Sequence, residues 1–185
     1  MSKKIEHNED KIREVMFSYA DTEFKNQNLV KYVDHYLEQY RIYLLNFTQL
    51  SDRRLKTNEF FLGINTAIMA VIGYIETREV AYAPVIFIFV PFVGVAICFS
   101  WYQIMNSFAK LTKAKFKVLH MVEEKLPISL FQSEWMMLGE GKDKKKYLPL
   151  SYIEKRIPLI FILLYLLIFF VNSPMMDLIR GYLPW

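Results

Sequence analysis

The sequence has very few residues of the kinds that build disulfides and metal sites. It contains one cysteine, Cys98, and three histidines. A single cysteine excludes an intramolecular disulfide and a cysteine-based metal site. His7, His35 and His120 stand far apart, and none has a second ligand at a spacing typical of metal motifs. We therefore expect no metal, no cofactor and no catalytic residue.

Glycine, proline and apolar runs are missing from the first part of the chain. No glycine or proline precedes residue 61, so nothing obliges a helix there to break. The N-terminal residues are polar with mixed charge, and no apolar block precedes residue 60. This pattern differs from that of a secretory signal peptide. We expect the first membrane-spanning helix itself to direct the chain to the membrane.

Charge is absent from three apolar blocks, at residues 60–75, 80–105 and 157–171. A membrane-spanning helix takes about 20 residues. The second block has 26 uncharged residues, which is too long for the core helix of a soluble protein. We predict an all-α integral membrane protein with three transmembrane helices, at about residues 59–76, 80–105 and 152–174.

The first two spans are expected to form a long antiparallel hairpin that extends into the cytoplasm, over residues 28–126. Only residues 76–79 separate the two blocks, so the connection is tight. Apolar residues alternate at spacings of four and three along both arms, which is typical of a coiled coil. They are Val33, Leu37, Tyr40, Leu44 and Phe47 on the first arm, and Ile104, Phe108, Leu111, Val118 and Val122 on the second.

Three further tyrosines, Tyr32, Tyr36 and Tyr43, widen the first seam into an aromatic face. We interpret this face as a helix-packing surface in preference to a ligand site. Residues 1–27 form a separate polar segment.

The distribution of positive charge predicts the orientation. Ten Lys and Arg residues precede the first block and eleven lie between the second and third, against only Arg78 in the tip and Arg180 in the tail. The positive-inside rule then places the N-terminus in the cytoplasm and the C-terminus outside. Trp101 suits the inner headgroup level, and residues 175–185 suit the outer one.

Residues 127–151 are predicted to be an irregular, basic, cytoplasmic segment. Its candidate contacts with anionic lipid or with a protein partner are Glu134, Trp135, Lys142, Lys144, Lys145 and Lys146. Gly139 and Gly141 lack the spacing and the hydroxyl of a phosphate-binding loop. Ser151 and Glu154 fit a capping box before the third span.

Polar residues within the apolar blocks are the best candidates for a site in the membrane. Asn65, Thr66, Ser100 and Gln103 either line a polar path or join helices by hydrogen bonds, and the second interpretation is the simpler one. Small residues that favour close helix approach lie near them, at Gly63, Ala67, Ala70 and Gly73.

No charged residue lies inside the blocks, which disfavours a transporter. Three carboxylates of the polar part, Glu123, Glu124 and Glu134, are interpreted as solvated helix charges, so they offer no active site.

Several short motifs resemble those of the RipA-like small integral membrane proteins of bacteria. They include residues 40–43, 52–54, 58–62, 115–118, 126–127, 134–135, 138–139, 147–149 and 153–154. The resemblance covers roughly residues 36–168 and implies a multi-pass protein of the bacterial inner membrane. The front half is also similar to the two-helix SLATT modules, which are predicted pore-forming effectors.

The function that we predict is a non-enzymatic, self-associating membrane protein of stress adaptation or defence, which alters membrane permeability. The alternative is a membrane-tethered scaffold that docks a cytoplasmic partner through residues 127–149. Lipids and further copies of the chain are the expected partners. Nucleic acid is not, because membrane topology already explains the +4 net charge.

Overall fold

The computed structural model describes residues 2–17, 29–78, 83–141 and 147–173, and all of its regular elements there are helical. Two helices are much longer than the rest: α3 spans Leu29–Glu76 and α4 spans Ala83–Glu123. The shorter elements are α1 (Ser2–Phe17), α5 (Leu130–Met137), the 3-10 turn η1 (Gly139–Gly141), α6 (Leu150–Glu154) and α7 (Arg156–Val171).

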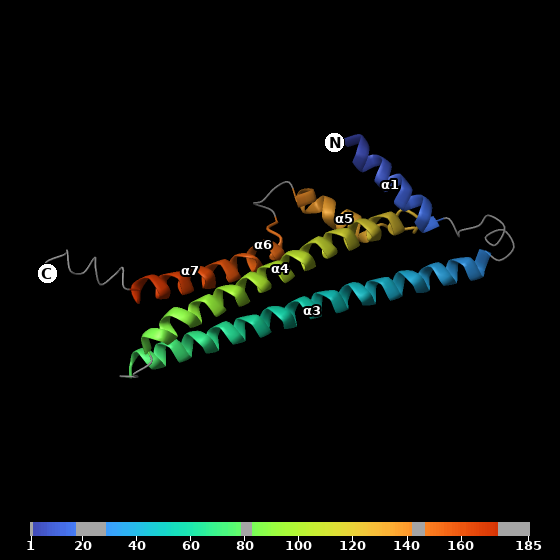
Figure 1. The fold of residues 1–185 in the computed structure, drawn as a ribbon. Helices are drawn as coiled ribbons and strands as arrows, with labels where there is room; N and C mark the ends of the chain where they lie inside the picture. The colour runs from blue at the N-terminus through green and yellow to red at the C-terminus, as the bar shows by residue number, and fades with distance from the viewer. Residues whose placement is uncertain (1, 18–28, 79–82, 142–146, 174–185) are drawn as a thin grey trace.

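The two long helices lie side by side and run in opposite directions (Figure 1). At about 1.5 Å per residue, the 48 residues of α3 extend roughly 70 Å. Both helices are long and apolar enough, over part of their length, to cross a membrane. The end where α3 finishes and α4 begins is apolar, and the opposite end carries the charged residues.

Helix α7 packs along the apolar half of α4, so α4 lies between α3 and α7 (Figure 1). The contact is close because Gly94 has no side chain. A Cβ atom there would lie 2.3 Å from the ring of Tyr165. Tyr165 is fully buried and joins a core that includes Ile72, Phe87 and Cys98, one or more from each of the three helices.

A break at Lys155 separates α6 from α7. Pro158 lacks the backbone N–H that would bond the carbonyl group of Glu154, so the helix is interrupted there. The predicted capping box is wrong: Pro149 precedes the first turn, and no side chain caps it. Glu154 is instead buried, and its carboxylate lies 3.5 Å from Nε of Arg54 on α3.

The inner seam of the long helices differs from the predicted one. Val33 and Leu37 on α3, and Leu111 on α4, are exposed. Phe47 packs edge-on against Phe116 of α4, at a centroid distance of 4.8 Å. The residues of α3 that face α4 are Tyr36, Tyr40, Tyr43, Phe47 and Leu50, so Tyr40 and Phe47 of the predicted seam are confirmed and Val33 and Leu37 are replaced.

Tyrosine displaces leucine and valine from this inner seam because its hydroxyl satisfies polar groups of the facing helix. The Tyr43 hydroxyl donates to the carbonyl oxygen of Lys115 at 3.3 Å, and the Tyr36 hydroxyl donates to that of Val122. An apolar-count argument misses this preference because it scores tyrosine below the aliphatic residues.

Residues 127–151 are not irregular throughout, because α5 and η1 lie within this range and α6 begins at its end. Backbone with positive φ at Gly139 and Glu140 ends the α5 region. Four candidate contacts, Lys142, Lys144, Lys145 and Lys146, lie outside the described residues, as does the predicted interfacial tail at 175–185.

Candidate functional site

A buried cluster of three polar side chains joins the three apolar helices. The side-chain oxygen of Asn65 on α3 accepts hydrogen bonds from the Tyr165 hydroxyl of α7, at 3.0 Å, and from the Cys98 thiol of α4, at 3.1 Å. The amide nitrogen of Asn65 donates to the carbonyl oxygen of Phe61 at 2.7 Å. All three side chains are 0% exposed. One amide group thus satisfies donors from two other helices.

Trp101 continues the contacts of this buried cluster toward the polar half of α4. Its indole N–H donates to the side-chain oxygen of Asn58 at 3.1 Å, and its ring stacks on Phe61 at 5.8 Å. The Trp101 side chain is fully buried between helices, and its level in the membrane stays a prediction. Its N–H needs a partner there, and Asn58 supplies it.

The other candidates in the apolar blocks have no part in this cluster. The Thr66 and Ser100 hydroxyls donate to the carbonyl oxygens four residues earlier in their own helices, Leu62 and Ala96. Gln103 is exposed, as are Thr66 and Ser100. Of the four residues, Asn65 alone joins helices of the chain. The other three lie on outer faces.

A second polar site lies where α4 ends, and its central residue was misread as a solvated charge. Glu123 is 0% exposed. Its carboxylate accepts hydrogen bonds from the backbone N–H groups of Phe131 and Gln132, at 3.1 and 3.0 Å, and from the Tyr40 hydroxyl at 3.3 Å. Glu123 therefore caps α5 while also binding α3.

Glu123 could have been found in part from the sequence. Pro127 obliges α4 to end, and a helix that starts again within a few residues needs acceptors for its first N–H groups. A glutamate at the end of the preceding helix is one such acceptor. No local pattern, however, indicates that Tyr40 of α3 approaches the same carboxylate, because 83 residues separate the two.

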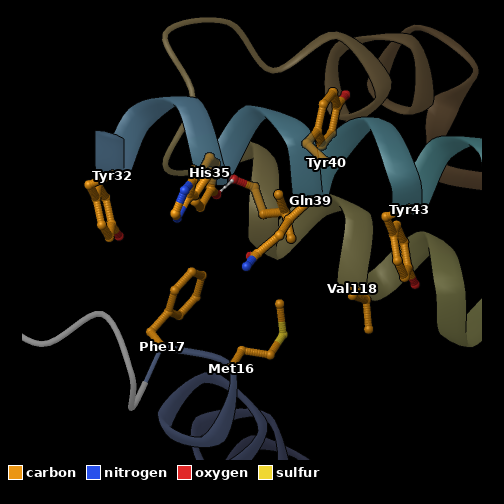
Figure 2. Close-up of a pocket in the computed structure, with 10 residues that line it drawn as sticks. Met16, Phe17, Tyr32, His35, Gln39, Tyr40, Tyr43 and Val118 are labelled. Carbon is orange, nitrogen blue, oxygen red and sulfur yellow. Dashed lines mark hydrogen bonds between the residues drawn. The ribbon is translucent and has the colours of Figure 1, made fainter. Parts of the chain in front are cut away.

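An aromatic pocket of about 520 Å³ lies beside this second site, between the ends of α1, α3 and α4 (Figure 2). Figure 2 shows the tyrosines of α3 along one side and Met16 and Phe17 of α1 across from them. Its lining comprises Met16, Phe17, Tyr32, His35, Tyr36, Gln39, Tyr40, Tyr43, Val118 and Val122.

The described lining of the pocket contains no Asp, Glu, Lys or Arg side chain. Burial raises the pKa of Tyr36 to about 12, with further contributions from the neighbouring Tyr32 and Tyr40. Burial also raises the pKa of Tyr43. Because the Tyr36, Tyr40 and Tyr43 hydroxyls bond to α4, the rings rather than the hydroxyls remain as contact surface.

An ion pair attaches α1 to α4 at this end. The two terminal guanidinium nitrogens of Arg13 each donate a hydrogen bond to one carboxylate oxygen of Glu124, and the bond from Nη2 to Oε1 is 2.8 Å long. The hydrogen bond from Arg13 holds the pKa of Glu124 below its ordinary value. Since both partners are more than a third exposed, the pair contributes little stability. The attachment of α1 is correspondingly weak.

The remaining candidates lie on or near α5. Trp135 is partly buried and meets the ring of Tyr147 edge-on at 6.3 Å, whereas Glu134 is exposed. Among the described residues, no group of three His, Cys, Asp or Glu side chains is placed to hold a metal ion.

Replacing Asn65 tests the buried cluster. In Asn65→Ala the Cys98 and Tyr165 donors lose their acceptor, and we expect unfolding to become easier by about 1–2 kcal/mol. Thr66→Ala is the matched control, since that hydroxyl bonds only within its own helix. The measurement is unfolding by dodecyl sulfate in mixed micelles, followed through Trp101 fluorescence. Equal stability of the two variants would contradict a joining role for Asn65.

Replacing Glu123 tests the attachment of α5. Glu123→Ala leaves the Phe131 and Gln132 amides without an acceptor, at a cost of about 2 kcal/mol, which corresponds to about 30-fold faster amide exchange. Hydrogen–deuterium exchange with mass spectrometry of residues 128–137 measures the effect. Glu134→Ala, at an exposed position of α5, serves as the control. Unchanged exchange in Glu123→Ala would show that α5 is held by other contacts.

Comparisons with known proteins give one positive result. Residues 37–174 match the octameric membrane protein family, 8xMP. No curated protein and no solved structure matches the chain. The match neither names nor tests the RipA-like and SLATT resemblances, but it agrees with the prediction of a small integral membrane protein. Because the match covers most of the chain and both long apolar helices, this protein belongs to the octameric membrane protein family.

Proposed function

We propose that this protein is a non-enzymatic membrane protein whose copies associate into an octamer, and that it acts in bacterial stress adaptation or defence. The observation that carries the proposal is the match of residues 37–174 to a family described as octameric. The long exposed faces of α3 and α4 support it, because they leave room for further helices on both sides of the chain.

In this proposal α3, α4 and α7 all cross the bacterial inner membrane, with α3 and α4 as a hairpin. Helix α7 has 16 residues, or roughly 24 Å, and α6 adds a further turn before Lys155. The polar end of the hairpin faces the cytoplasm, because nearly all Lys and Arg residues belong to that side. The C-terminal tail then lies outside.

An effect on membrane permeability is the proposed activity. Thr66, Ser100 and Gln103 support it, since these polar side chains lie on outer faces of the apolar helices or at their edge. An assembly of several copies brings such groups together where the copies meet, whereas a single copy exposes them to lipid. Lysines 142 and 144–146 are proposed to contact anionic lipid headgroups.

A scaffold that docks a cytoplasmic partner is the second candidate. The observation in its favour is the apolar surface of α5, where Met136 and Met137 are 62% and 83% exposed. Glu134 and Trp135 of the same helix are the proposed contacts.

Native mass spectrometry of the full chain in lipid nanodiscs tests the proposal. We expect a single species of eight times the 22.1 kDa chain mass, plus bound lipid. That species, placed in liposomes, should raise ion flux above that of empty liposomes. A monomer would contradict the octamer and favour the scaffold. An octamer without flux would contradict the permeability effect alone.

A further inference from the structure

Two outer faces of the hairpin are built as seams for a further helix. On α3 the exposed small residues Gly63, Thr66, Ala70 and Gly73 recur at spacings of three and four. A Cβ atom added at Gly63 or Gly73 would meet nothing within 4 Å, so this face is open. On α4 the exposed residues Phe89, Val93, Ala96, Ser100 and Gln103 recur at spacings of four and three. Such alternation is the signature of helix–helix packing.

The two seams lie on opposite sides of the protomer. The α3 residues that face α4, such as Phe61 and Asn65, are on the far side of the helix from the small residues. The α4 residues that face inward, such as Cys98 and Trp101, are likewise on the far side from Ser100. One chain therefore presents a groove of small residues on one flank and a ridge with large phenylalanines on the other.

Membrane topology decides how such flanks meet in an octamer. All copies share one orientation, because their positive charge fixes it. Closed assemblies with one orientation are cyclic, and each contact then joins two different surfaces of adjacent copies. We infer that the small-residue seam of α3 packs against the outer seam of α4 in the next copy of this chain. This inference rests on the proposed octamer and names its interface.

Depth in the membrane sets the register of this contact. Within one chain Asn65 lies level with Cys98, and Phe61 with Trp101. Cyclic symmetry keeps all copies at one depth, so the same levels apply between copies. Gly63 lies two residues before Asn65 in α3, and Ser100 lies two residues after Cys98 in the antiparallel helix α4. Gly63 is therefore level with Ser100 of the next copy. At the tip end, counting from the Phe61–Trp101 level places Gly73 opposite Phe89, which is 65% exposed in the protomer.

Charges on the polar side agree with this register. Counting from the Phe61–Trp101 level places Asp52 opposite Lys110, and Glu59 opposite the Gln103 amide. All four side chains are exposed, and within the described residues none has a hydrogen-bond or ion-pair partner in its own chain. Asp52 of the α3 flank therefore meets a cation, and Glu59 meets an amide donor, on the α4 flank. Small side chains thus face large ones, and opposite charges face each other. This complementarity indicates that the molecule packed on each flank is a second copy of the chain.

Cysteine cross-linking of the full chain in nanodiscs tests the interface, in a Cys98→Ser background that keeps a hydrogen-bond donor for Asn65. Chains with Gly63→Cys and chains with Ser100→Cys are co-expressed and oxidised without a spacer. A disulfide needs Cα atoms within about 7 Å. We expect cross-linked pairs from the mixture and none from either variant alone. Leu163→Cys on the exposed face of α7 replaces Ser100→Cys as the matched control and should give no pairs.

Charge reversal provides the second variant set, in case the cysteines disturb folding. Asp52→Lys and Lys110→Asp each place like charges opposite one another at every contact, so each should reduce the octamer fraction in native mass spectrometry. The double variant restores opposite charges and should restore the octamer. An octamer with no Gly63–Ser100 cross-link and no rescue would overturn this interface while leaving the proposed function standing. Absence of any octamer would overturn both.

Discussion

The fold depends on one acceptor, the side-chain oxygen of Asn65. In the proposed arrangement α3, α4 and α7 all cross the membrane, and they gain little there from hydrophobic burial against one another, because lipid tails are equally apolar. Their relative positions must come from close packing and from hydrogen bonds. Asn65 accepts bonds from Cys98 and Tyr165, one from each of the other two helices. Gly94 makes the close packing possible, since it has no side chain and so leaves room for the Tyr165 ring.

The polar end repeats this principle with a carboxylate. Glu123 is the counterpart of Asn65, because it holds the start of α5 and approaches the Tyr40 hydroxyl of α3. Between these two fixed points α3 and α4 pack through aromatic rings. The facing sides of α3 and α4 thus make many contacts within the chain. The outer faces carry small residues, serines and unpaired charges, which is the surface that an associating protein needs.

The sequence predicted the helical class, and the apolar second block predicted a long helix because 26 uncharged residues fit little else. It did not predict the partners of Asn65, which lie 33 and 100 residues away. The seam was predicted in part: Tyr40 and Phe47 face α4 as predicted, whereas Val33 and Leu37 are exposed. Glu123 was misread because local pattern gives a charge, but only tertiary contacts show its burial.

The most direct test is an electron cryomicroscopy reconstruction of the full chain in lipid nanodiscs. The account predicts eight copies around one axis, with the Asn65, Cys98 and Tyr165 side chains inside each copy and α3 of one copy against α4 of the next. Copies that meet through α7, or an Asn65 side chain facing a central lumen, would contradict it.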